Sequence, residues 1–336
     1  MAKENLELGS KSLDTGSSGL LAGKKHSMVL ASQFSVMIGL ILMMVVFSLM
    51  SPVFLTTGNI MNILIQSGTN AAIAAGMTFV ILAGHIDLSV GPILAFSSVV
   101  ATTYMANGGP IPVAAMIGLV VATLLGMFNG ICIARFKLQA FIVTMSSMWF
   151  LRGLCYVYSN GRAVMGLPPA YRKLAAGKIC GIPNVVFIVV IVYALGHFVL
   201  AKTKLGRHIY AIGDNKDAAY LSGVNVQKVE ILVFMISGFC AGLSGLIYSS
   251  RLFSGQPVAG SGYELSAIAA VVIGGTSLSG GVGSIGGTLI GVLFISTLMN
   301  GLTILNVSAF WQQVFMGFVI LGAVFLDHYR KTLIQA

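Results

Sequence analysis

Residues 28–50 read "MVLASQFSVMIGLILMMVVFSLM", a run without a single charged side chain. At about 1.5 Å per residue, a helix of that length crosses a hydrocarbon core about 30 Å thick. The rest of the chain has the same character, because 57% of its 336 residues are hydrophobic and only 8% are charged. An ordinary soluble domain has about 25% charged residues. The composition therefore predicts an all-α polytopic membrane protein, since a β-barrel would show short alternating segments.

The apolar runs and their breaks predict about ten transmembrane helices. Their expected ranges are 28–50, 62–83, 88–106, 111–134, 138–158, 182–201, 229–250, 263–278, 285–304 and 308–327. An even number of crossings places both termini on one side, and most of the 19 basic residues fall on that side. The positive-inside rule makes it the cytoplasmic side, with residues 1–27 and 331–336 as tails and residues 28–330 as the transmembrane domain. No small-residue cleavage pattern follows the first apolar run, so we expect a retained cytoplasmic tail rather than a signal peptide.

The formal charge of +10 does not predict nucleic-acid binding, because the basic residues lie between apolar runs. The four cysteines occur without a C-x-x-C pair, so the sequence signals neither a metal site nor a disulfide framework. We therefore expect the cysteines to be packing residues.

Two connections are too long and polar to be simple turns, 159–181 on the outer side and 202–228 on the inner side. Long loops are where partners dock. The inner loop contains "GDNKDAAYLSG", in which Asp214 or Asn215 can cap a short helix that Gly223 ends. We therefore expect a short helix outside the bilayer.

The sequence contains a weak internal repeat. "VILAGHIDLSVG" at 80–91 resembles "VVIGGTSLSGGVG" at 271–283 when one gap is allowed. Interrupted spans in two related halves are typical of transporters built from repeats, with the broken helices near the transport route.

Asp87 and Glu264 are the only acids that we expect inside an apolar run or at its mouth. Asp87 has two interpretations. It either carries a proton or cation, or it caps a broken helix by accepting backbone N–H bonds, which is the interpretation we favour. Glu264 either lies at a solvated rim or pairs with Arg251.

Several polar residues also fall within or beside the spans. Most such groups bond to neighbouring helices, and a minority line a pathway for a hydroxyl-rich solute. The candidates for the pathway or for a helix break are Asp87, Ser89, Asn70, Asn129, Glu264 and Asn300. No aromatic clamp or charged cage is visible, so we expect the passage to bind its solute weakly.

Four long motifs resemble the permease subunits of bacterial ATP-binding cassette (ABC) importers for monosaccharides, above all ribose permeases. They are "AGMTFVILAGHIDLSVG", "LGRHIYAIGDNKDAAYLSGVNV", "SGYELSAIAAVVIGGTSLSGGVGSIGGTLIG" and "LMNGLTILNVSAFWQQ". The resemblance covers about residues 28–330. This chain departs from many such permeases at His85 and at "GDN", where "GGN" is common.

The resemblance implies a type II ABC importer fold with two related halves in the bacterial inner membrane. It also implies a homodimer of permeases in contact with lipid, a cytoplasmic ATPase subunit that holds ATP and Mg, and a periplasmic sugar-binding protein. This chain itself would carry no cofactor and catalyse nothing. The segment expected to couple to the ATPase contains Gly213, Asp214, Asn215, Ala218, Ala219 and Gly223. The residues expected to dock the binding protein are Arg162, Arg172, Lys173 and Arg251.

Two alternatives remain. A proton-coupled secondary sugar transporter would use Asp87 as its carrier acid. A passive channel or membrane scaffold would need no ATPase. A membrane enzyme is not indicated, because no motif places a nucleophile beside a base.

Overall fold

The computed structural model describes residues 33–335, and the expected N-terminal tail lies outside them. Apolar helices dominate this part of the chain. Eight helices are long and apolar enough to cross a membrane: Gln33–Met50, α2 (Thr57–Leu82), α4 (Ile111–Phe136), α5 (Ala140–Ser159), α7 (Asn184–Lys202), α10 (Val226–Leu252), α12 (Ile285–Ile304) and α13 (Ala309–Gln335). Two shorter apolar helices, α3 (Val90–Ala106) and α11 (Tyr263–Ile273), complete the set. The all-α prediction is confirmed, and α13 continues past its expected end at 327.

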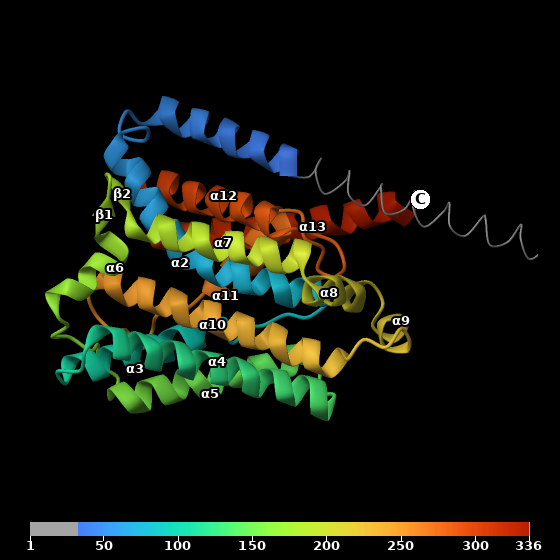
Figure 1. Cartoon of the computed structure of the whole chain (residues 1–336). Coiled ribbons are helices and arrows are strands. Elements are labelled where there is room, and N and C mark those ends of the chain that lie inside the picture. The colour runs from blue at the N-terminus through green and yellow to red at the C-terminus, as the bar shows by residue number, and fades with distance from the viewer. Residues whose placement is uncertain (1–32, 336) are drawn as a thin grey trace, which may run out of the picture.

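The helices form one bundle whose two ends differ (Figure 1). At one end lie the helices α8 (Lys204–Asp214) and α9 (Lys216–Leu221). At the other end lie α6 (Lys173–Ala176) and a two-stranded hairpin of β1 (Lys178–Ile179) and β2 (Ile182–Pro183). We call these the inner and outer ends, following the charge distribution.

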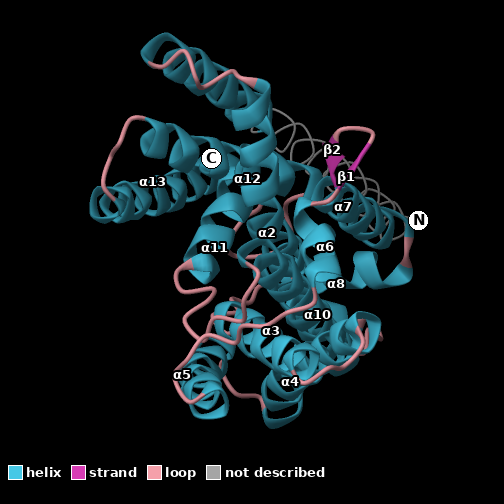
Figure 2. Ribbon diagram, turned by 90° about the vertical axis from the view of Figure 1, so that its left-hand side faces the viewer, coloured by secondary structure: helices cyan, strands magenta, loops and turns pink. Residues whose placement is uncertain are grey.

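Helices α2 and α10 form the centre of the bundle. In the view along the bundle they lie in the middle, whereas α5 and α13 lie at the edge (Figure 2). Of the spans described, α2 has the largest buried share, 83%, and α13 the smallest, 6%. A helix such as α13, whose apolar side chains are mostly exposed on the bundle, is expected where the surrounding solvent is hydrocarbon.

Small residues bring the central helices into close contact. A Cβ at Gly126 of α4 would collide with the carbonyl of Phe234 in α10, and a Cβ at Gly238 of α10 would collide with the carbonyl of Ala122 in α4. Lipid tails provide no hydrophobic drive between helices, so close van der Waals contact through small residues has to supply the association.

The loops after α2 and α11 end their helices in the same way. The N–H of His85 donates to Val80 O at 3.0 Å and that of Gly84 to Ile81 O at 2.9 Å. After α11, Thr276 N–H donates to Val271 O at 3.1 Å and Gly275 N–H to Val272 O at 2.9 Å. Both glycines have positive φ, +80° and +92°. This is the Schellman helix end, and it gives the weak sequence repeat a structural counterpart.

The outer loop 159–181 is anchored rather than free. It contains the 3₁₀ helix η1 (Pro169–Arg172), whose Tyr171 side chain is buried. The Tyr171 hydroxyl donates to Leu246 O of α10 at 3.0 Å. Val164 also pairs with Gly255, which joins this loop to the segment before α11.

We predict that Gly238→Leu separates α4 from α10 and lowers the free energy of unfolding by about 1–3 kcal/mol, the usual cost of overpacking. Thermal unfolding of the detergent-solubilised protein measures the loss. The matched control is Gly153→Leu in α5, where a Cβ meets nothing within 4 Å. Equal unfolding temperatures for the two variants would contradict the close packing.

Candidate functional site

Asp87 lies in the loop between α2 and α3 and is fully buried. Its Oδ1 accepts hydrogen bonds from Ser89 N–H at 2.9 Å and from Ser89 Oγ at 2.5 Å. Its Oδ2 accepts one from Ser237 Oγ of α10 at 2.8 Å. Both carboxylate oxygens therefore have donors from the protein. The N-cap position of α3 belongs to Ser89, so Asp87 accepts one backbone N–H and two hydroxyls rather than capping the helix as we expected.

The same hydrogen-bond chain continues into two more helices. Asn129 of α4 donates from Nδ2 to Ser89 Oγ at 2.9 Å. Its Oδ1 accepts from Ser147 Oγ of α5 at 2.5 Å. Asp87, Ser89 and Asn129 thus tie the loop after α2 to α4, α5 and α10. A buried network in which every member is satisfied rigidifies the helices that it joins.

Asn300 also binds a neighbouring helix. Its amide exchanges two hydrogen bonds with Asn59 of α2, at 2.9 and 3.0 Å, and both residues are buried. The pair fixes α12 against α2. The structure therefore gives Asn300 a role between helices.

At the inner end, three segments that are distant in sequence meet. Gly213 of α8 packs directly on Leu82 O at the end of α2 and on Gly281 N in the loop before α12. Gly281 N–H donates to Leu82 O at 3.0 Å. Tyr210 of α8 donates its hydroxyl to Gly283 O at 2.9 Å. Burial raises the pKa of Tyr210, which keeps the phenol protonated as a donor.

The expected short helix is present as α9, with Asn215 as its N-cap. Asn215 Oδ1 accepts from Ala218 N–H at 2.9 Å, and Gly223 follows the helix with a φ of +82°. Asp214 belongs instead to α8, a helix that we did not predict. Thr203 caps α8 by accepting from Gly206 N–H at 3.3 Å, a signal that the sequence carried.

Helix α9 buries a small residue on one side and exposes large apolar residues to solvent. Ala219 is buried, whereas Ala218 is exposed. Tyr220 is 70% exposed and Leu221 is 84% exposed. Large apolar side chains on a short helix outside the spans are typical of a protein-docking surface.

A buried carboxylate connects α9 to the interior. Glu230, near the start of α10, is 1% exposed. Its Oε1 accepts from Lys216 Nζ of α9 at 2.6 Å and lies 2.9 Å from His85 Nε2. His85 is two residues from Asp87. We did not single out Glu230, and the expectation that only Asp87 and Glu264 lie in or beside apolar runs is wrong. Asp327 of α13 is a further buried acid.

The basic residues of the outer end are mostly exposed. Arg162, Arg172 and Lys173 are exposed, and Arg172 lies 6.0 Å from the ring centroid of Phe253. Arg251 is half-buried and stacks over Tyr248 at 5.6 Å. No ion pair joins Arg251 to Glu264 among residues 33–335, so of the two alternatives for Glu264 the pairing with Arg251 is not supported.

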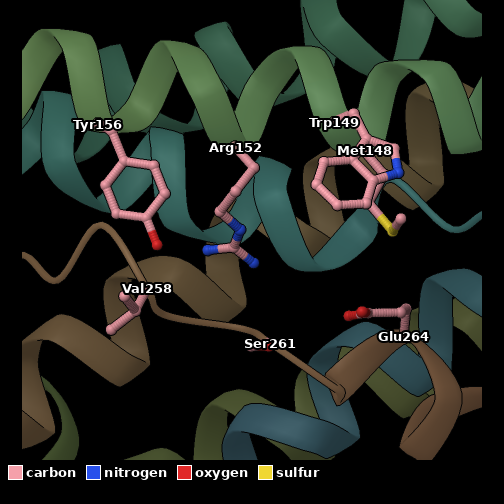
Figure 3. Close-up of a pocket in the computed structure, with 7 residues that line it drawn as sticks. All are labelled: Met148, Trp149, Arg152, Tyr156, Val258, Ser261 and Glu264. Carbon is pink, nitrogen blue, oxygen red and sulfur yellow. The ribbon is translucent and has the colours of Figure 1, made fainter.

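Two cavities flank α11. The first has a volume of about 160 Å³, and its lining includes Asn70, Arg251 and Ser266. Asn70 Oδ1 is buried and accepts no hydrogen bond from the described residues. The second, of about 300 Å³, lies between α5 and α11 and contains the side chains of Arg152 and Glu264 (Figure 3). Asn70 and Glu264, two of the expected pathway residues, therefore line these two cavities.

We predict that Asp87→Ala lowers the free energy of unfolding by about 1–3 kcal/mol, because three donors lose a buried acceptor. Asp87→Asn should retain most of the stability, since an amide can accept from Ser89 and donate to Ser237. Thermal unfolding in detergent measures both. Ser146→Ala is the control, because the Ser146 hydroxyl is exposed and bonds only within α5. An Asp87→Ala protein as stable as this control would contradict the role of the network.

Comparison with known proteins agrees with this architecture. Residues 59–324 match the family described as the permease component of branched-chain amino acid transport systems. The chain is 45% identical to the ribose import permease protein RbsC of Haemophilus influenzae, over 88% of this chain and 93% of that protein. It is 46% identical to RbsC of Bacillus subtilis, over 88% and 92%, and 42% identical to the D-allose transport system permease protein AlsC of Escherichia coli, over 86% and 89%. No solved structure matches. The chain belongs to this family of transport-system permease components.

Proposed function

We propose that this chain is the permease subunit of an ABC importer that carries a monosaccharide, with ribose as the first candidate, across the bacterial inner membrane. The proposal is supported by the ribose import permeases, to which the chain is 45% and 46% identical over nearly their full length. Both termini lie in the cytoplasm in this proposal, as the distribution of basic residues indicates.

A separate ATPase subunit supplies the energy and holds ATP and Mg. The observation that carries this step is the placement of α9, which exposes Tyr220 and Leu221 and is bonded through Lys216 to buried Glu230. In this proposal α9 binds in a cleft of the ATPase. Its movement is transmitted through α8, whose Gly213 contacts the loops after α2 and before α12. Gly213, Asp214, Asn215, Ala218, Ala219 and Gly223 form the segment that transmits this movement.

A periplasmic sugar-binding protein delivers the solute at the outer end. Its docking surface on this chain includes Arg162, Arg172, Lys173 and Arg251. Arg162, Arg172 and Lys173 are exposed at one end of the bundle, where they can meet acidic lobes of the partner. Exposed charges of this kind steer association and are screened by salt.

A second copy of the permease completes the passage, and lipid covers the remaining apolar surface. In each copy, Asp87, Ser89, Asn129 and Asn300 hold helices in register, while Asn70 and Glu264 face the cavities. The passage is gated by movement of the two loops that carry the related helix ends.

We predict that Glu230→Gln uncouples transport from ATP hydrolysis, because a neutral amide loses the ion pair that ties α9 to α10. Stimulation of the ATPase by the loaded binding protein should fall about 5- to 100-fold, the usual range of an intersite coupling. The measurement uses the complete complex of permease, ATPase and binding protein in proteoliposomes.

Asp217→Asn is the matched control, since Asp217 also lies on α9 but is exposed. Lys216→Ala should reproduce the Glu230→Gln defect, because it removes the other half of the pair. Full stimulation in Glu230→Gln proteoliposomes that contain intact complex would refute this coupling route.

The proton-coupled alternative makes the opposite prediction for energy supply. Our proposal predicts that a protonophore leaves uptake unchanged while ATP is present, and that removal of ATP abolishes uptake. The Asp87 hydrogen-bond network favours our proposal, because both carboxylate oxygens already accept bonds from serine donors. Vesicle uptake of labelled ribose with each treatment decides between the two, and loss of uptake with the protonophore would establish the alternative.

A further inference from the structure

The cavity between α5 and α11 combines aromatic, cationic and anionic side chains at one place. Its volume is about 300 Å³. The residues that line it are Met148, Trp149, Arg152, Tyr156, Val258, Ser261 and Glu264. Small-molecule pockets begin at about this volume. A water molecule occupies about 30 Å³ in the liquid, so the cavity has room for about ten waters, and a pentose has a similar number of non-hydrogen atoms.

The aromatic side comes from α5. Trp149 and Tyr156 flank Arg152 on one face of the helix, at the i, i+3 and i+7 spacing that places residues on the same side. Trp149 is 72% exposed. Tryptophans at membrane interfaces occur near helix ends, but Trp149 lies at the middle of α5 (Ala140–Ser159). Its position therefore calls for a different explanation, and an aromatic face offers a surface for the C–H groups of a sugar ring.

The polar side has an acceptor opposite a donor. Figure 3 shows the Glu264 carboxylate and the Arg152 guanidinium on opposite walls of the cavity, from α11 and α5. Glu264 Oε2 is buried and accepts no hydrogen bond from the described residues. Arg152 Nη1 donates to Pro257 O at 2.8 Å and to Ala259 O at 2.7 Å, which fixes the guanidinium and leaves other N–H groups for a ligand.

The surrounding backbone holds the carboxylate in place. A Cβ at Gly91 of α3 would collide with Glu264 Oε2 and with Gly260 O, so only glycine lets the carboxylate lie there. Glu264 is also in the first turn of α11, where the helix dipole favours a negative charge. The acceptor is thus positioned before any ligand arrives.

We propose that this cavity is a sugar-contact subsite in the outer half of the passage, a deepening that rests on the proposed function. Trp149 packs on the ring, Glu264 accepts hydrogen bonds from hydroxyls, and Arg152 donates to them. One charge of each sign suits a neutral solute whose hydroxyls both donate and accept. The affinity is weak, with Kd on the order of 1–10 mM (about −4 to −3 kcal/mol), because a passage must release what it binds.

The first test uses the chain's own fluorescence. The sequence has two tryptophans, Trp149 and Trp311, so Trp311→Phe leaves Trp149 as the reporter. The full-length variant in lipid nanodiscs is titrated with D-ribose and, separately, with L-leucine. We expect a saturable change in emission with ribose, no change with leucine, and an affinity at least about tenfold weaker in Trp311→Phe/Glu264→Ala, as befits a lost charged hydrogen bond. Trp149→Phe, which reports only on Trp311 in α13, is the control and should not respond.

The second test separates this subsite from binding-protein docking. In the complete complex, Trp149→Ala and Glu264→Ala should lower the maximal uptake rate several-fold, without raising the binding-protein concentration that gives half-maximal uptake. A docking defect would raise that concentration. Phe150→Ala is the matched control, because Phe150 is exposed on α5 and does not line the cavity.

The outcomes distinguish the two proposals. The subsite is wrong if ribose leaves Trp149 emission unchanged, if leucine alone alters it, or if both variants transport at the rate of the unaltered protein. The proposed function survives each of these results, provided that the unaltered complex takes up ribose with ATP. Failure of the unaltered complex to take up any monosaccharide overturns the proposed function itself.

Discussion

A hydrocarbon core supplies no hydrogen bonds, so each polar group inside this bundle has to find its partner within the protein. Asp87 illustrates the constraint most clearly. An Asp at the centre of a span costs about 2.5–3.5 kcal/mol on insertion scales, yet here the carboxylate is fully buried and accepts bonds from Ser89 and Ser237. Because Ser89 in turn accepts from Asn129, the requirement of one acid fixes the mutual positions of α3, α4, α5 and α10.

The same constraint explains the organisation of the inner end. Helix ends leave carbonyls without intrahelical partners. The carbonyl of Leu82 at the end of α2 accepts from Gly281, and Gly213 of α8 packs against both. Helix α8 is therefore in backbone contact with the two loops whose helix ends share one geometry. Glu230 adds a side-chain link to the same region through Lys216 and His85. Helix α9 is linked to the loop of Asp87 through two contacts of Glu230, one with Lys216 and one with His85.

Much of this architecture could be predicted from the sequence, because the signals are local. Apolar length gives the spans, Asn215 and Gly223 bracket α9, and the glycines at 84 and 275 mark the two related helix ends. The remainder depends on pairs that are distant in sequence. Asn59 meets Asn300 and His85 meets Glu230 only after the helices pack. Nothing near Glu230 in "KVEILVF" indicates its partners, because Lys216 and His85 come close to it only in the folded bundle. Arg251 and Glu264 are near in sequence but form no ion pair among the described residues, and Arg251 stacks on Tyr248.

Hydrogen-bond partners distinguish polar residues that join helices from polar residues that keep a free acceptor, a distinction that residue type alone does not give. Asp87, Asn129 and Asn300 all have partners on neighbouring helices, so they hold the bundle and have little left to offer a solute. Asn70 and Glu264 each keep a buried oxygen that no described residue satisfies, and both of these residues line cavities that flank α11. A buried acceptor without a donor costs about 1–3 kcal/mol, so these two residues keep hydrogen-bonding capacity that the other three have used within the protein. Helix α11 is also shorter than a full span and meets Gly91 of α3 at its start. The starts of these two short helices therefore bring the backbone of Gly91 into contact with the Glu264 carboxylate at the wall of a cavity.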